Sequence, residues 1–153
     1  MRIAIASDHA GFVQKDPLAE YLRAQGHEVV DCGPDSDERC DYPDYADKVA
    51  RRVARGEVDR GVLICGTGLG IAMTADKVAG VRATPIQTVE FARLAREHND
   101  ANVIGLSGRF VSLEDNEKIL DAFLTTEFGG GRHTARVEKM MREDDPAFPG
   151  VEA

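Results

Sequence analysis

The chain has 153 residues, 42% of them hydrophobic and 30% charged, so it is long enough for one compact domain with its own core. Its formal net charge is −8, which argues against a nucleic-acid-binding or anionic membrane surface, because both require a basic patch. A small anionic substrate is not excluded, since a few arginines hold one phosphate whatever the total charge.

Apolar runs alternate with helical patterns along the chain. The runs predict five strands, at residues 2–7, 27–33, 60–65, 81–86 and 101–107. The helical patterns predict six helices, at residues 17–26, 45–57, 70–80, 88–98, 116–128 and 133–141. Because the two interleave, we expect an α/β sandwich with a five-stranded parallel sheet. Residues 1–145 would form this single domain, and residues 146–153 a loose acidic tail.

Turn and cap residues mark several helix ends. Pro17 suits the first turn of its helix, and Gly26 suits the position just past the end. Thr88 can cap the helix that follows it, and Ser112 with Asp115 resembles a capping box.

The cysteines and the N-terminus indicate a cytoplasmic protein. No apolar run approaches the roughly 20 residues that span a bilayer, and the opening "MRIAIASDHAG" lacks the pattern of a signal peptide. Cys32, Cys40 and Cys65 are odd in number and form no CxxC pair, so we expect reduced thiols, with neither a zinc site nor a disulfide framework.

Chemically active side chains follow the predicted strands. Asp8 and His9 come directly after the first strand, and Arg109 follows the fifth. The helix after the fourth strand ends in His98 and Asn99. Because ligands of such folds bind at the carboxyl ends of the strands, we expect these groups to meet at one edge of the sheet.

The stretch "ICGTGLGIA" after the third strand allows several interpretations. Its Gly66-x-Gly68-x-Gly70 spacing differs from the dinucleotide fingerprint, which follows a first strand. A phosphatase thiol loop would place an arginine where Ile71 stands. Two possibilities remain: a loop whose amides hold an anion or developing negative charge, or only a tight turn that requires glycine.

Two side chains have both a functional and a structural interpretation. A thiol beside a helix N-terminus loses its proton more readily and could act as a base, but Cys65 could equally pack as a small hydrophobe. His98 continues the helical stripe of Phe91, Leu94 and Ala95, which favours a core histidine, although its place at a helix end also suits function.

Arg132 and Arg136 lie one helical turn apart at the start of the last helix. They could form a solvated basic edge, or they could hold a phosphate, since guanidinium groups match oxyanions.

Five segments resemble one known family. These are "SDHAG", "DYPDYA", "GVLICGTGLGIAMTADKVAGVRA", "ARLAREHNDANVIGLSGR" and "GGRHTARV", which follow one another with the family's spacing from about residue 2 to residue 140. On them the chain resembles the type B ribose-5-phosphate isomerases, whose wider group includes galactose-6-phosphate and allose-6-phosphate isomerases.

The resemblance implies a Rossmann-like α/β/α domain and a homodimer or dimer of dimers with active sites between subunits. It implies that Cys65 is the base and that Thr67 and His98 assist ring opening. No step of such an isomerisation requires a metal or other cofactor, and the sequence shows no metal-ligand spacing. The remaining roles are substrate binding. Asp8 and Asn99 would bind sugar hydroxyls or the enediolate, Tyr42 would line the pocket, the amides of Gly66, Gly68 and Gly70 would stabilise negative charge, and His9, Arg109, Arg132 and Arg136 would hold the phosphate.

The chain also differs from parts of the family. One branch lacks the cysteine and has a glutamate at the position of Ile71, so the chain resembles the cysteine branch. The segment 84–91 and the pair Asp16-Pro17 depart from the commoner pattern.

We therefore expect an isomerase that interconverts ribose 5-phosphate and ribulose 5-phosphate. The alternatives are an isomerase of another phosphosugar with six or four carbons, a phosphosugar-binding module without turnover, and a thiol redox protein centred on Cys65. The retained Cys65 and His98 favour an enzyme over a binding module, and the lack of a CxxC partner disfavours redox chemistry.

Overall fold

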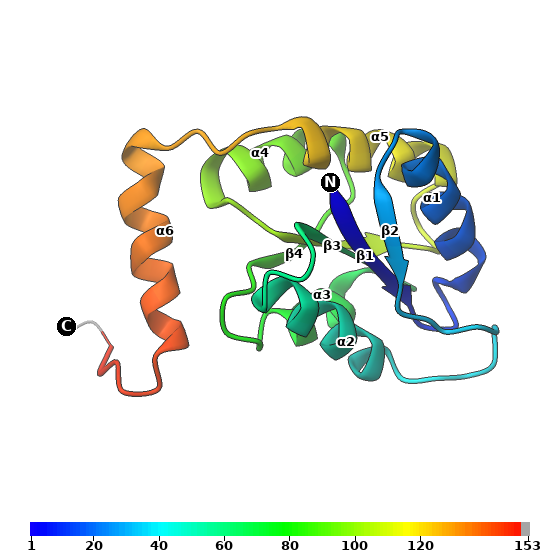
Figure 1. Ribbon diagram of the computed structural model, residues 1–153, viewed down its shortest axis with the longest axis horizontal. Helices are drawn as coiled ribbons and strands as arrows, with labels where there is room; N and C mark the ends of the chain where they lie inside the picture. Colours follow the sequence, from blue (N-terminus) through cyan, green and yellow to red (C-terminus); the bar gives the residue numbers. More distant parts are fainter. Residues whose placement is uncertain (151–153) are drawn as a thin grey trace.

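A five-stranded parallel sheet lies between two layers of helices in the computed structural model, which describes residues 1–150 (Figure 1). The strand order is β2-β1-β3-β5-β4. The strands are β1 (Arg2–Ser7), β2 (Glu28–Asp31), β3 (Arg60–Cys65), β4 (Ala83–Pro85) and β5 (Val103–Ser107). The predicted α/β sandwich with a parallel sheet is therefore confirmed.

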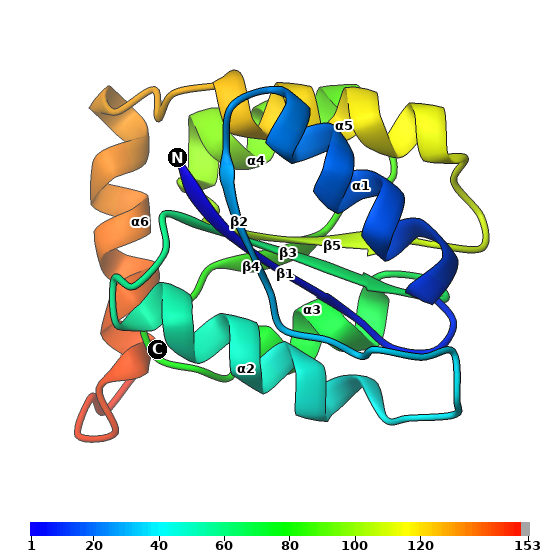
Figure 2. The same ribbon diagram turned by 45° about the vertical axis from the view of Figure 1, so that its right-hand side comes forward.

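The helices divide between the two faces of the sheet (Figure 2). One face carries α1 (Phe12–Ala24), α4 (Val89–Asn99) and α5 (Leu113–Thr125). The other carries α2 (Tyr42–Ala54) and α3 (Leu69–Ala75). After a short 3-10 turn (Gly131–His133), α6 (Thr134–Met141) stands beside the sheet rather than on it, and a second 3-10 turn (Arg142–Asp144) follows.

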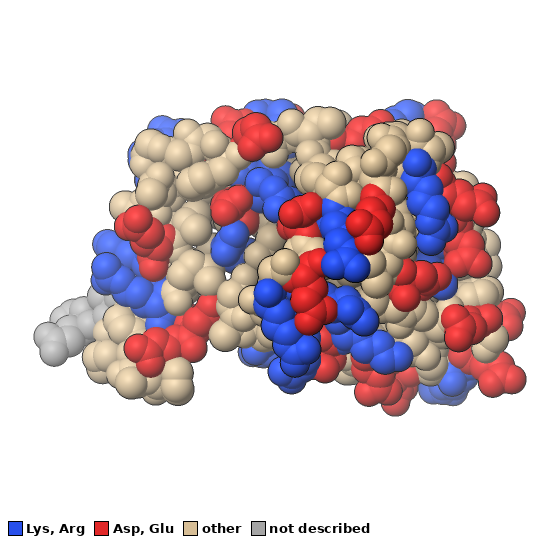
Figure 3. All heavy atoms as spheres, viewed as in Figure 1, with Lys and Arg blue, Asp and Glu red and all other residues tan. Residues whose placement is uncertain are grey.

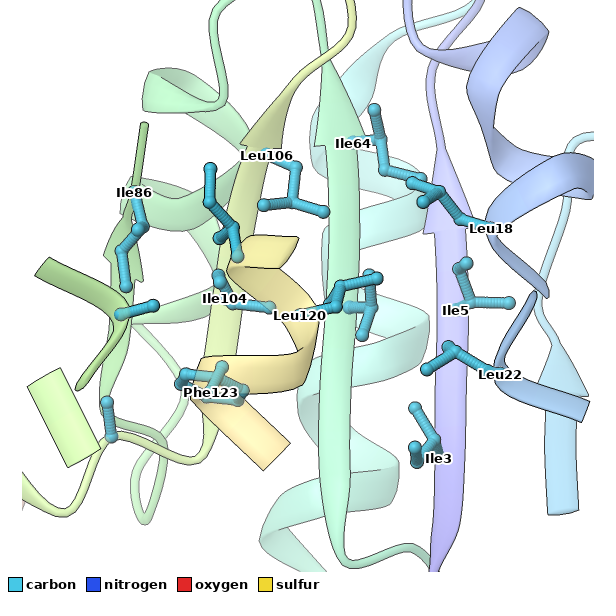
Figure 4. Packing of buried hydrophobic residues seen from close by; sticks show 14 of the residues in the cluster. Ile3, Ile5, Leu18, Leu22, Ile64, Ile86, Ile104, Leu106, Leu120 and Phe123 are labelled. Carbon is cyan, nitrogen blue, oxygen red and sulfur yellow. The ribbon is translucent and has the colours of Figure 1, made fainter. Parts of the chain in front are cut away.

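The alternation of side chains along the inner strands produces two cores. In β1, Ile3 and Ile5 face the α1, α4 and α5 layer, where they pack with residues such as Leu120 and Phe123 (Figure 4). Ala4 and its neighbour Ala6 face α2 and α3. Because both faces are covered, the inner strands have continuous apolar runs such as Ile3–Ala6, as expected for a parallel sheet.

The first helix begins five residues before its predicted start. Pro17 lies inside α1 rather than in its first turn. The Asp8 carboxylate sets the start instead, because its Oδ1 accepts hydrogen bonds from the backbone N–H groups of Ala10 (2.9 Å) and Gly11 (3.0 Å). The predicted end at Gly26 is confirmed: its φ is 87°, and the helix closes in a Schellman motif.

Other helix and strand boundaries differ from their predicted positions by a few residues. The caps at Thr88 and Ser112 are confirmed, since their hydroxyls accept from the N–H groups of Phe91 and Asp115. With Ser112 as N-cap, α5 begins three residues before its prediction. Predicted helix 45–57 begins and ends three residues earlier, and predicted helix 70–80 ends at Ala75. The predicted strands at 27–33, 81–86 and 101–107 are longer than β2, β4 and β5.

Charged side chains of both signs are interspersed on the face shown in Figure 3. Within residues 1–150, no helix is long and apolar enough to cross a bilayer. Cys32, Cys40 and Cys65 are free thiols. Of the predicted loose tail 146–153, residues 151–153 lie outside the described part of the chain.

Candidate active site

The sheet reverses its direction of winding between β1 and β3. The chain leaves β1 for the edge strand β2 and then returns to the other side of β1 as β3. The loops after β1 and β3 therefore diverge at the carboxyl edge, which is where ligands bind in open parallel sheets. Asp8 follows β1 at this point, and Cys65 ends β3.

The Cys65 side chain lies under the first turn after β3. Its Sγ accepts a hydrogen bond from the backbone N–H of Gly68 at 3.1 Å, and the residue is 5% exposed. Gly68 caps α3 with a φ of 80°, a conformation that favours glycine. The thiol is thus held against a backbone N–H donor.

The loop after β5 holds the Cys65 loop in place. The Ser107 hydroxyl donates to the carbonyl of Gly66 (2.9 Å), and the N–H of Gly108 donates to the carbonyl of Cys65 (2.8 Å). The N–H of Arg109 also donates to Gly66 (3.2 Å). These bonds place the exposed Arg109 side chain beside the glycine loop, so its guanidinium is available to an anion there.

Two glycines let α3 approach β5. A Cβ on Gly68 would lie 2.9 Å from the carbonyl oxygen of Gly105, and a Cβ on Gly105 would lie 2.6 Å from the carbonyl oxygen of Gly68. The position of the loop amides thus depends on the absence of both side chains.

Gly105→Ala should lower the free energy of unfolding by about 1–3 kcal/mol, because the added methyl group forces α3 away from the sheet. Gly66→Ala is the control, since its Cβ would meet nothing closer than Cδ of Arg109 at 3.4 Å. Urea unfolding followed by circular dichroism compares the two. Equal midpoints for both variants would show that the close approach does not matter.

The polar groups after β1 border the same loop. Asp8 is buried and uses Oδ1 for the turn into α1, while among the described residues its Oδ2 accepts no hydrogen bond. The Nδ1 of His9 lies 3.0 Å from the carbonyl oxygen of Cys40, which fixes the ring.

Tyr42, the first residue of α2, packs on Gly70, where a Cβ would meet its ring at 2.7 Å. The partly exposed Thr67 lies between Cys65 and Gly70 in sequence.

Four predicted site residues lie at the opposite edge of the sheet. Helix α4 runs back from the carboxyl end of β4, so its final residues His98 and Asn99 lie near the start of β5. Arg132, in the 3-10 turn before α6, and Arg136, in α6, lie on this side too. In Figure 2 the strand arrowheads point away from α6. A six-residue strand such as β3 is about 20 Å long, which separates the two sets. The expectation that His98 and Asn99 meet Asp8, His9 and Arg109 at one edge of the sheet is therefore wrong.

His98 is not a core residue, so the interpretation from the apolar stripe is also wrong. Its side chain is 35% exposed, and Phe91 on the same stripe is 63% exposed. The ring stacks on His133, with centroids 4.3 Å apart and planes at 11°. Sequence reasoning passed over His133, although it lies in the same segment as the two arginines. Partial burial and the charges of His98, Arg132 and Arg136 lower the pKa of His133, which favours a neutral ring in the stack.

The arginines at α6 are open to solvent. Arg132 and Arg136 are both exposed, and no residue of α6 is buried within the described chain. Their guanidinium groups are free to contact a ligand or a second chain on this side.

Two clefts of the described chain lie away from the Cys65 loop. One, of about 630 Å³, lies between β2 and α2 and is lined by residues such as Cys32, Tyr45 and Arg52. A cleft of about 280 Å³ includes Asn99 and Met140. Among residues 1–150, no group of three His, Cys, Asp or Glu side chains could hold a metal ion.

Fold and site together define an α/β/α protein in which a buried thiol, a carboxylate and an amide-lined loop converge at the switch point of the sheet. This arrangement suits proton-transfer chemistry on a small anionic substrate. Residues 3–140 match a protein family described as Ribose/Galactose Isomerase, and the chain belongs to that family.

Individual relatives match this chain over most of their length. The chain is 49% identical over 137 residues to ribose-5-phosphate isomerase B of Escherichia coli (strain K12), covering 90% of this chain and 92% of the relative. The structure of ribose-5-phosphate isomerase B from Clostridium thermocellum superposes with a TM-score of 0.93 at 47% identity, covering 94% and 97% of the two chains. That of the Mycoplasma genitalium protein, solved with bound ribulose-5-phosphate, gives 0.90 at 46% identity, covering 94% and 95%.

Proposed function

We propose that this chain is an aldose–ketose isomerase that interconverts ribose 5-phosphate and ribulose 5-phosphate. The observation that carries the proposal is the match, along nine tenths of both chains, to proteins named ribose-5-phosphate isomerase B. One of those structures was solved with ribulose-5-phosphate bound. The thiol held in an amide-lined loop supplies the chemistry that such a reaction requires.

The proposed reaction begins with ring opening. The ring oxygen of ribose 5-phosphate gains a proton and the anomeric hydroxyl loses one, which exposes the C1 aldehyde. His98 and Thr67 carry groups of the right type for this exchange. Because the imidazole of His98 is a third exposed, it is accessible to a substrate.

Proton transfer between carbons follows. The Cys65 thiolate removes the proton from C2, and the electron pair forms the C1–C2 double bond of a cis-enediolate. The C2 hydroxyl passes its proton to the C1 oxygen as the C2 oxygen becomes the ketone. Cys65 then delivers a proton to C1, and this proton exchanges with solvent while the thiol holds it. The backbone N–H groups from Gly66 to Gly70 stabilise the oxygen that carries the negative charge, a contribution worth about 10²–10³ in rate for one donor.

The remaining site residues bind the substrate. Asp8 and Asn99 hold sugar hydroxyls or the enediolate, and Tyr42 lines the pocket from its place on Gly70. His9, Arg109, Arg132 and Arg136 bind the phosphate, whose distance from the reacting carbons lets binding energy assist the chemical step.

A site that uses all of these residues requires two chains. Cys65 and His98 lie at opposite edges of one sheet, so the proposed pocket pairs the carboxyl edge of one chain with the α4 and α6 side of another. Helix α6, which has no buried residue of its own, is the natural element to lie against a partner. We therefore propose a homodimer or dimer of dimers with symmetric, intersubunit sites. A cytoplasmic location stays a prediction.

The substrate preference is tested by comparing kcat/KM for ribose 5-phosphate and allose 6-phosphate, using added chelator in all assays. The proposal expects the five-carbon substrate to be preferred. A preference for the six-carbon sugar would move the function to another member of the same family. Binding of both sugars without turnover of either would make the chain a phosphosugar-binding module.

A further inference from the structure

Helix α4 ends in a strained turn directly after two proposed site residues. Asp100 follows His98 and Asn99 and has a φ of 48°, and it is the only residue other than glycine with a positive φ among residues 1–150. Its N–H donates to the carbonyl of Arg96 at 3.1 Å. Such a conformation persists only where the surroundings hold it, and it is frequent at functional sites.

One side of the Asp100 carboxylate is held by a buried arginine. Arg96 is 2% exposed, and its Nη1 donates to Oδ1 of Asp100 at 2.8 Å. The same nitrogen donates to the carbonyl of Ala101 (2.6 Å), and Nε donates to the carbonyl of Thr126 (3.3 Å). Arg96 thus ties the turn to the end of α5, and it keeps two carbonyl partners even without the carboxylate.

The other side is held by an arginine at the start of β4. Arg82 donates from Nη2 to Oδ2 of Asp100 (2.8 Å) and from Nε to the carbonyl oxygen of the same residue (2.7 Å). The N–H of Arg82 in turn donates to Oδ1 of Asn102 (2.8 Å). Arg82 therefore binds both the backbone and the side chain of the strained residue.

Arginine side chains surround this turn. Besides Arg82 and Arg96, Arg60 lies near: burial and the positive charge of Arg96 lower the pKa of its guanidinium, while the charges of Asp100 and Asp59 oppose this shift. Asp100 is the carboxylate that Arg82 and Arg96 share, so ion pairs as well as backbone hydrogen bonds fix the turn.

Given the proposed function, on which this inference rests, we propose that Asp100 is a positioning residue. Its carboxylate is bound by Arg82 and Arg96 and fixes the turn that follows His98 and Asn99. In Figure 1 the loop from α4 to β5 begins on the side where α6 stands, which is the side with Arg132 and Arg136. Asp100 touches no substrate in this scheme. It acts by holding the end of α4 in one orientation toward the partner chain's Cys65 loop.

The test compares Asp100→Gly, Asp100→Asn and the control Glu90→Gln. Glycine accepts the positive φ but removes the carboxylate. Asparagine tolerates the turn and keeps an oxygen for Arg96, so it should restore part of the function. Glu90→Gln weakens the ion pair with Arg93 in the first turn of the same helix and leaves the Asp100 carboxylate with both of its arginines.

Two reactions are followed for each protein. One is conversion of cyclic ribose 5-phosphate, which requires ring opening. The other is incorporation of solvent deuterium at C1 of ribulose 5-phosphate, an open-chain ketose that needs the Cys65 base but no ring opening. Asp100→Gly should lower kcat for conversion by up to about 10²-fold, while C1 exchange, which uses Asn99 but not His98, should fall less. Asp100→Asn should lie between Asp100→Gly and the wild type, and Glu90→Gln should match the wild type.

A purely structural role gives a different result. If Asp100→Gly lowers both reactions in the same proportion, or leaves kcat for conversion unchanged, the proposal is overturned. A wild type that converts no ribose 5-phosphate would instead contradict the proposed function.

Hydrogen–deuterium exchange of backbone amides tests the turn without any substrate. Asp100→Gly should speed exchange at residues 98–101 and leave the first turn of α4 unchanged. Equal protection of residues 98–101 in the wild type and Asp100→Gly would overturn the proposal even for an inactive enzyme.

Discussion

Cys65→Ser should lower kcat for ribose 5-phosphate conversion by about 10²–10⁴-fold, the usual contribution of a general base. A serine hydroxyl at the same place can accept the hydrogen bond from Gly68, yet it does not ionise near neutral pH as a thiol can. The substitution is small and the pocket is otherwise unchanged. Binding of ribose 5-phosphate, measured by calorimetry on the inactive variant, should therefore stay close to the wild-type KM.

Cys32→Ser is the matched control for this loss. It replaces another partly buried thiol in the same core, and its Sγ lies near a carbonyl of its own strand rather than in the glycine loop. Turnover by Cys32→Ser should stay near that of the wild type. Undiminished turnover by Cys65→Ser would remove Cys65 from the role of base.

His98→Asn should separate ring opening from proton transfer. Loss of the imidazole is expected to lower conversion of ribose 5-phosphate by about 10²-fold, because a positioned acid–base group no longer assists ring opening. Ribulose 5-phosphate carries its phosphate on the C5 oxygen, so it cannot close a five-membered ring and needs no such step. Deuterium exchange at its C1, followed by NMR in D₂O, should stay close to the wild-type rate.

His27→Asn is the control for this prediction, since His27 lies beside the N-terminus and far along the chain from the site. Both reactions should be unchanged in it. A parallel loss of conversion and C1 exchange in His98→Asn would show that His98 serves the chemistry at carbon, or the fold, rather than ring opening.

The pattern of hydrophobic residues along the sequence was sufficient to predict the architecture. Buried strands such as β3 are apolar after their first residue, so their number and order in the chain could be predicted. Boundaries depended on single interactions that no pattern reveals. Asp8, not Pro17, starts α1, because a carboxylate bonding two backbone N–H groups outweighs the tendency of proline to begin a helix.

The sequence suggested which residues to propose for the site more readily than it predicted where they lie in the fold. Asp8, Cys65 and Arg109 lie together because each follows a strand whose carboxyl end reaches the same edge. His98 was misplaced because a helix between parallel strands returns to the amino edge before it ends. Two contacts join distant segments, so only the structure reveals them. They are the stacking of His98 on His133 and the hydrogen bonds from Arg82 and Arg96 to Asp100.

Mixing Cys65→Ser and His98→Asn chains tests the shared site most directly. The two inactive variants are unfolded together at equal amounts, refolded and assayed for ribose 5-phosphate conversion. If the site pairs Cys65 of one chain with His98 of another, half of the dimers are mixed and each contains one intact site, so about a quarter of wild-type activity should return. If each chain forms its own site, every site keeps a defect, and a mixture as inactive as its parents would contradict the intersubunit site.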